Sequence, residues 1–205
     1  MSITNGYITL MELKSSLSET PMDTNASDDT VMEDIIEAAS RHIDNETRRR
    51  FYSTTADETR YYKATNRGRV FVDDLLTVTS IKTDEDYDRT FETTLATTDY
   101  LLCPDNALLN GEPYTWIEID PLSSNYFPTT RRGVQIVGTF GFCTTPPDDI
   151  KQACLMISVS LYQSRRGAGV EGVATVTGAG VVITPKDVPQ MARLIINHRT
   201  KFWGG

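Results

Sequence analysis

One amphipathic helix, predicted over residues 28–49, most constrains what this chain can fold into. Its apolar side chains recur three or four residues apart and share one stripe, formed by Val31, Ile35, Ile36, Ala39 and Ile43. Charged residues take the remaining surface, and Glu37–Arg41 and Asp44–Arg48 have the i,i+4 spacing that supports a helix. Such a stripe needs an apolar partner. The helices predicted over residues 148–165 and 188–202 are the natural candidates, because the strands between are mostly too polar.

This order of elements predicts an α+β fold, a bundle of three or four helices with a small antiparallel β domain inserted into it. A further short helix is predicted over residues 10–17, where Thr9 and Glu12 have the spacing of a capping box. The bundle comprises residues 1–50 and 146–205, and the β insertion residues 51–145. At 205 residues, the chain can bury a substantial core as one large domain or two small ones.

Within the insertion, short Thr-, Val- and aromatic-rich stretches alternate with turn residues, which is typical of strands. Asn66-Arg67-Gly68 predicts a hairpin between the strands 61–64 and 69–72. The other predicted strands are 77–82, 90–95, 100–103, 116–119 and 133–140. Six or seven strands would make a small sheet or partly closed barrel that packs on the helices.

The helix over 148–165 is apolar around most of its circumference, from Ile150 to Tyr162. A helix of this kind is buried on nearly all sides. In a chain of this size, that pattern predicts that a neighbouring subunit covers the side that the chain's own core does not.

Residues 166–185 are rich in glycine and valine and carry few charges. Their glycines include Gly167, Gly169, Gly172, Gly178 and Gly180. One interpretation is an extended segment that pairs with the sheet edge of another chain. The alternative is a β-hairpin within the same domain. Gly167, Gly169 and Gly172 also match the dinucleotide-binding string, but that site needs a strand before it and a helix after it.

Candidate catalytic and metal-binding patterns are weak throughout the sequence. Asp84, Asp86 and Asp88 resemble the start of a calcium loop, but Arg89 and Leu95 replace its required Gly and Glu. The two histidines, His42 and His198, have no metal-ligand spacing. The three cysteines contain no C-x-x-C pair and are interpreted as reduced, buried thiols. We therefore expect no enzyme activity, no cofactor and no bound metal.

The net charge of −8 argues against a protein that grips nucleic acid, which needs clustered Lys and Arg. It suits a surface that nucleic acid slides past. The clusters Arg48–Arg50, Arg131–Arg132 and Arg165–Arg166 are interpreted as helix-end and loop charges. The alternatives are salt bridges to adjacent subunits or a mild contact with passing DNA. No signal peptide and no membrane-spanning run are predicted.

Several segments, in this order, resemble the head-tail connector (adaptor, or head completion) proteins of long-tailed bacteriophages. The similarity begins in Tyr7–Lys14 and in Asp29–Phe51, continues in Asp73–Ile81 and Gly133–Gly141, and ends in Pro147–Ala153 and Leu161–Arg165. Its strength lies in the order of these segments, since no single one carries chemistry.

The resemblance implies a structural virion protein, assembled in the host cytoplasm, that forms a ring of twelve copies under the portal. Such a ring extends the channel for double-stranded DNA, without sequence-specific binding, and offers a platform to the next neck or tail protein. The alternatives are a stopper or tail-terminator protein of the neck, or a soluble ligand-binding domain.

Site residues follow from this interpretation in three groups. The predicted subunit interface consists of Ile35, Ala39, Ile43, Ile157, Leu161 and Tyr162. The predicted portal- or neck-binding residues are Arg199, Lys201, Phe202 and Trp203. The five glycines of the 166–185 segment are the predicted channel or ring contact.

Overall fold

The chain folds into two compact units in a computed structural model that describes residues 3–17, 28–167, 175–176, 182–183 and 188–201. The first unit comprises residues 1–49 and 146–205, and the second comprises residues 50–145. The described helices belong mainly to the first unit and the six-stranded sheet to the second. The predicted α+β class is therefore confirmed.

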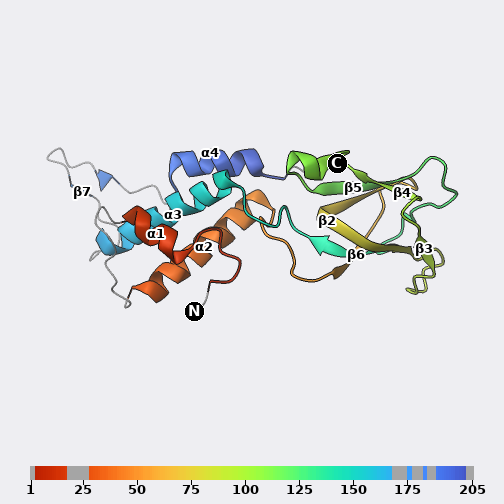
Figure 1. Cartoon of the computed structure of the whole chain (residues 1–205), viewed down its shortest axis with the longest axis horizontal. Helices are drawn as coiled ribbons and strands as arrows, with labels where there is room; N and C mark the ends of the chain where they lie inside the picture. Colours follow the sequence, from red (N-terminus) through yellow and green to blue (C-terminus); the bar gives the residue numbers. More distant parts are fainter. Residues whose placement is uncertain (1–2, 18–27, 168–174, 177–181, 184–187, 202–205) are drawn as a thin grey trace. The chain divides into compact units, whose positions relative to one another are not determined.

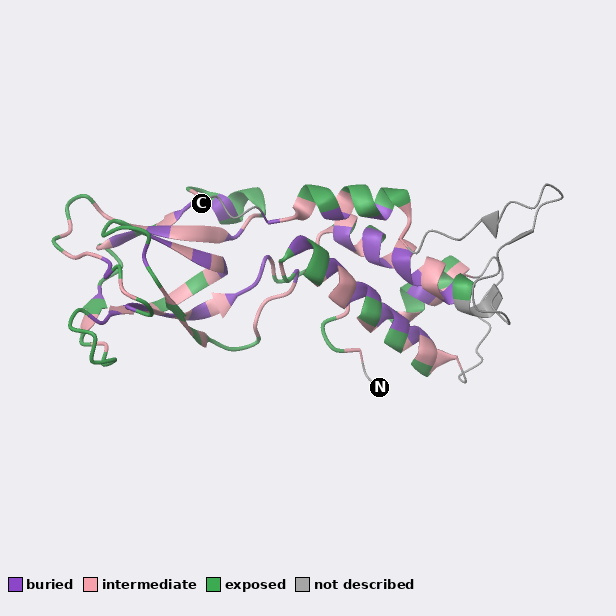
Figure 2. Ribbon diagram, turned by 180° about the vertical axis from the view of Figure 1, so that it is seen from behind, coloured by how far each residue is buried: buried purple, intermediate pink, exposed green. Residues whose placement is uncertain are grey.

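In the first unit, α3 packs against each of the other three α-helices that the structure describes (Figure 1). The helices are α1 (Leu10–Leu17), α2 (Asp29–Thr47), α3 (Asp148–Gly167) and α4 (Gln190–Arg199). Figure 2 shows their buried faces in purple. The core consists of side chains at most 3% exposed, including Leu13, Ile36, Ala39, Ile43, Ile150, Ala153, Ala192 and Ile196.

Local hydrogen bonds and backbone angles fix where the helices begin and end. The predicted capping box forms at α1: the Glu12 backbone N–H donates to Thr9 Oγ1 at 3.2 Å, and the Thr9 N–H donates to Glu12 Oε2 at 2.6 Å. Helix α2 ends earlier than predicted, because Arg48 takes the left-handed conformation with φ 56°. Helix α4 is also shorter than predicted, with its first turn following the extended Pro189.

Helix α3 has one side that the chain's own core does not cover, as the sequence pattern predicted; its cover by a neighbouring subunit stays a prediction. Ile150, Cys154 and Ile157 are buried, but Leu155 and Met156 are only half-buried. The apolar circumference exceeds what the unit's own core covers, because α1, α2 and α4 do not surround α3 completely. A partly exposed apolar strip therefore remains.

The second unit is an antiparallel sheet in the strand order β1-β6-β2-β5-β4, with β3 paired to β2. Its strands are β1 (Glu58–Tyr62), β2 (Arg69–Thr83), β3 (Thr93–Leu95), β4 (Tyr100–Cys103), β5 (Tyr114–Ile119) and β6 (Val134–Phe140). A short 3₁₀-helix, η1 (Ala107–Asn110), lies in the β4–β5 connection. Strands β1 and β4 are thus at opposite ends of the strand order.

The predicted hairpin between the first two strands is wrong in its pairing. The turn at residues 66–69 closes as an Asn66–Arg69 bridge, but β1 pairs with β6 instead of β2. Strand β6 buries Val134, Ile136 and Phe140 on one face and bonds to neighbours along both edges. Strand β6 therefore lies between β1 and β2, the two strands that the sequence predicted to pair.

Two strands that the sequence separated form one long strand, β2. Its first half pairs with β5, and most of the remainder pairs with β6. The register shifts between Phe71 and Leu75, between Leu75 and Thr77, and between Val78 and Ser80. These irregularities let β2 bend and continue through residues 73–76, which separated the two predicted strands.

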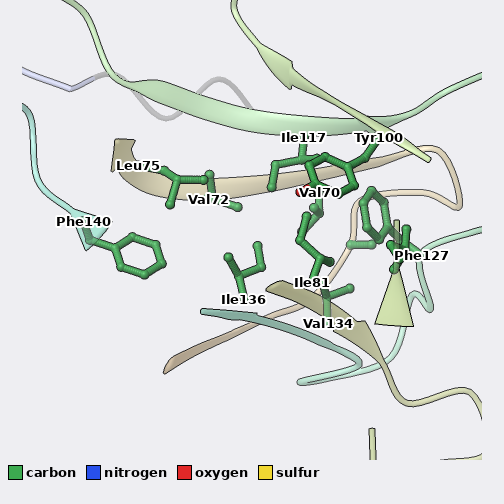
Figure 3. Packing of buried hydrophobic residues seen from close by; sticks show 12 residues of the cluster. Val70, Val72, Leu75, Ile81, Tyr100, Ile117, Phe127, Val134, Ile136 and Phe140 are labelled. Carbon is green, nitrogen blue, oxygen red and sulfur yellow. The ribbon is translucent and has the colours of Figure 1, made fainter. Parts of the chain in front are cut away.

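The sheet buries a core of its own (Figure 3). Every second residue along its strands points to the same face, so strands that look polar by composition still supply apolar side chains. The twelve buried members are Ala64, Val70, Val72, Leu75, Ile81, Leu95, Tyr100, Ile117, Phe127, Val134, Ile136 and Phe140.

In the Gly/Val-rich segment, β7 (Thr175–Val176) pairs antiparallel with β8 (Val182–Ile183). The hairpin within the chain, one of the two sequence interpretations, is thus confirmed for these four residues. Gly169, Gly172, Gly178 and Gly180 lie outside the described residues, and Gly167 is the last residue of α3.

Candidate interaction surfaces

Most of the predicted subunit-interface residues lie in the core of the helical unit. Ile35 is 8% exposed, Ala39 and Ile43 are fully buried, and Ile157 and Tyr162 are at most 5% exposed. In this conformation their side chains leave almost no area for a neighbouring subunit. Ile35, Ala39, Ile43, Ile157 and Tyr162 thus belong to the core of the unit in the single chain, Leu161 is half-buried, and a role of these residues in a subunit interface stays a prediction.

The described C-terminal residues are tied to the bundle. Arg199 Nε donates to Asp149 Oδ2 at 2.8 Å, which joins α4 to the start of α3. The Lys201 backbone N–H donates to the Thr47 carbonyl oxygen at 2.8 Å, and the residue is buried. These contacts give Arg199 and Lys201 a structural role. Phe202 and Trp203 lie outside the described residues.

A shallow groove of about 600 Å³ lies on the helical unit between α3 and α4. Its apolar lining comes from the strip of α3 that the core leaves half-buried, and from Met191, which is 59% exposed. The lining residues are Ser16, Gln152, Leu155, Met156, Val159, Ser160, Gln163, Pro189, Gln190 and Met191. The groove thus exposes the part of the apolar circumference of α3 that the core does not cover.

The β unit carries a second concavity, of about 720 Å³, that combines arginines with aromatic rings. We call it the Arg/aromatic pocket; it is lined by Tyr61, Asp84, Tyr87, Arg89, Phe91, Thr130, Arg131 and Arg132. The Tyr61 and Phe91 rings pack with centroids 5.6 Å apart, and the Arg132 guanidinium lies 4.3 Å from the Tyr61 centroid. The sequence pattern of Arg131–Arg132 indicated a loop charge or a contact with a neighbour, and gave no sign of the aromatic rings beside it.

Backbone strain concentrates around this pocket. Six non-glycine residues in the described part of the chain have positive φ, and Tyr87, Arg89 and Arg132 are three of them. Their φ values are 72°, 71° and 63°. Such conformations are unfavourable for these side chains and often mark functional sites.

The Asp84–Asp88 turn holds three carboxylates close together, but its hydrogen bonds are internal. Ligand oxygens of Asp84, Asp86 and Asp88 lie within 4.8 Å of one another. Asp84 accepts from the backbone N–H groups of Tyr87 and Arg89, at 2.8 and 3.1 Å, and Asp88 accepts from Thr90. The geometry is that of a turn stabilised by its own carboxylates.

The described cysteines have the surroundings of packed thiols. Cys154 is fully buried, and its Sγ lies 3.5 Å from Ser40 Oγ. Burial raises the pKa of the Cys154 thiol, and burial likewise raises the pKa of Cys103. Both groups are therefore poor nucleophiles, which agrees with the sequence interpretation of buried thiols for these two residues; Cys143 is only half-buried.

Comparison with known proteins shows a similarity to solved structures. No protein-family model and no curated protein matches the chain. Among solved structures, the fold is similar to a chain of the structure described as "Neck of empty GTA particle computed with C6 symmetry", with TM-score 0.59 and 17% identity. The match covers 100% of this chain and 96% of that one. The likeness establishes a shared fold over both units.

In the described residues, no helix is long and apolar enough to cross a membrane.

Proposed function

We propose that this chain is a structural neck protein of a tailed-phage-type particle, and that identical copies form a ring between the DNA-filled head and the tail. The observation that carries the proposal is the fold match along the whole chain to a component of a particle neck. The order of sequence segments that resembles head-tail connector proteins supports the same role independently.

Surface properties support this role over a catalytic one. The Arg/aromatic pocket and the helical groove are surfaces of the kind that protein partners cover. The net charge of −8 suits a channel wall that does not retain passing DNA. We propose that the chain has no enzymatic activity. The six-fold symmetry of the similar neck structure is compatible with rings of six or twelve copies.

The test is to produce particles that lack this protein and image them. We expect DNA-filled or leaking heads without tails, and recovery when the full-length chain is supplied in trans. In recovered particles, imaging should place the protein at the vertex that joins head and tail. Normal infectious particles without the protein would contradict the proposal.

A related experiment examines the predicted portal-facing end. Phe202→Ala/Trp203→Ala should reduce attachment to isolated portal rings in a co-sedimentation assay. Leu122→Ala, at a position that is 97% exposed and lines neither concavity, is the control.

A further inference from the structure

The Arg/aromatic pocket gathers three arginines in a negatively charged unit. Residues 50–145 contain fourteen Asp and Glu but only nine Lys and Arg, and three of those nine line this pocket. Within the part of the chain that the structure describes, Arg89, Arg131 and Arg132 form no ion pair. The nearby carboxylates are engaged locally, since Glu85 accepts from Tyr126 and Thr93, and Asp88 from Thr90.

This arrangement favours an acidic protein segment over nucleic acid as the occupant. A DNA backbone presents a continuous row of phosphates, whereas the three arginines form one compact cluster that is interrupted by Asp84 and offers no extended basic surface. Arginine and tyrosine in a single concavity are instead typical of the residues that dominate protein interfaces. The occupant should therefore combine an apolar side chain with a carboxylate.

The chain itself presents such a segment in the β4–β5 connection. Leu109 is 85% exposed and Leu108 is 47% exposed, and the exposed Asp105 lies just before them. We call residues 105–112 the leucine turn.

The leucine turn is held in place by backbone hydrogen bonds. Ala107 is buried beneath it, its N–H donates to the Pro104 carbonyl at 3.2 Å, and the Glu112 N–H donates to the Ala107 carbonyl at 2.9 Å. Two exposed leucines on a fixed turn lose little conformational freedom when another surface covers them.

The pocket and the turn lie toward opposite edges of the sheet. Tyr61, in the pocket, belongs to the edge strand β1, and the leucine turn follows the edge strand β4. Two different, complementary surfaces on one chain produce a head-to-tail contact, which closes into a ring when the rotation between copies permits.

We propose that the leucine turn of one copy docks in the Arg/aromatic pocket of the next. Leu108 and Leu109 contact Tyr61, Tyr87 and Phe91, and Asp105 faces the three arginines. The inference rests on the proposed ring and adds the two surfaces that join its members.

Cysteine cross-linking of the full-length chain tests this contact. In a Cys143→Ser background, Leu109→Cys and Arg131→Cys are combined, and concentrated protein is treated with a bismaleimide. We expect a ladder of covalent multimers. The matched control combines Leu122→Cys with Arg131→Cys, because Leu122 is 97% exposed but lies outside the leucine turn. Mixing the two single variants, Leu109→Cys and Arg131→Cys, should give covalent dimers only, since each supplies one half of the contact.

Light scattering on the same samples separates the two proposals. Multimers without the ladder, or with an equal ladder in the Leu122 control, would overturn the docking inference and leave the ring in place. Monomers at every concentration, without cross-links, would count against both. A ladder specific to residues 109 and 131 supports both.

Discussion

The Tyr62 hydroxyl donates a hydrogen bond to Asp73 Oδ2 at 3.0 Å, although strand β6 lies between the strands that carry the two residues. Arg60 Nη1 donates to the same oxygen at 2.9 Å. Burial, followed by the negative charge of Asp73, raises the pKa of Tyr62 well above its usual value. These side chains link β1 to β2 across β6, the strand whose pairing with β1 the sequence did not predict.

Because the pKa of Tyr62 is raised, the free energy of unfolding changes with pH in the alkaline range. Above about pH 10 the unfolded chain releases the tyrosine proton while the folded protein retains it, so this contribution to stability is lost as the pH rises. Tyr62→Phe should flatten the decline in unfolding free energy between about pH 9 and pH 11 and cost about 1 kcal/mol at pH 8. Urea unfolding, monitored by the fluorescence of Trp116 in a Trp203→Phe background, measures both the pH dependence and the cost at pH 8. Tyr61→Phe, in the same strand, is the control, and identical pH slopes for Tyr62→Phe and the parent would contradict the prediction.

The capping box at α1 predicts a loss of stability in Thr9→Ala. Removing the hydroxyl leaves a helix N–H without its acceptor and should cost about 0.5–2 kcal/mol in the unfolding free energy. The backbone N–H of Thr9, and next its hydroxyl, lower the pKa of Glu12, so the contribution of Glu12 is present near neutral pH and lost as the pH falls through the lowered value. Chemical denaturation at pH 7 and pH 3 measures both effects. Ser15→Ala, at an exposed position of the same helix, should be nearly neutral; an equal cost in both variants would argue against capping.

Gly138 is required by the close approach of β6 and β2. A Cβ at this position would lie 2.0 Å from the Thr77 carbonyl oxygen, which is backbone and cannot move aside as a side chain does. Gly138→Ala should therefore lower the free energy of unfolding by about 1–3 kcal/mol or more, the range for overpacked sites. Gly68→Ala, whose added Cβ meets only Asn66 Oδ1 at 3.5 Å, should be tolerated. Thermal unfolding of both variants provides the comparison, and equal melting temperatures would show that the sheet absorbs the clash.

Thiol reactivity should follow burial. Cys143 is half-buried, whereas Cys103 and Cys154 are buried. We expect iodoacetamide to label Cys143 first in the native protein, with Cys154 labelled only on unfolding. Peptide mass spectrometry after timed quenching gives the order; rapid native labelling of Cys154 would mean that the helical core opens readily.

Local signals in the sequence predicted the helices well and the strand partners poorly. The periodic stripe of Ile36, Ala39 and Ile43 and the Thr9–Glu12 capping box depend on neighbours three or four residues away, and both form. The pairing of β1 with β6 depends on residues more than seventy positions apart, as in Tyr62 and Val134. The turn signal at Asn66–Gly68 carries no information about β6, which lies much later in the sequence.

The candidate surfaces were harder to predict for the same reason. Tyr61, Arg89 and Arg132 come from three separate segments, and only the folded sheet brings them together. The apolar character of α3 was visible in the sequence, but which residues stay exposed depends on how α1 and α4 cover it. Ile157 therefore turned out to be core, while Met156 lines the groove.

The sheet encloses its own apolar interior between two chain crossings, near residues 50 and 145. Loops on that sheet can consequently lengthen, shorten or change charge without disturbing how the four helices seal against one another. During evolution, substitutions in residues 50–145 can thus adapt this unit to new protein neighbours while the helical unit stays unchanged.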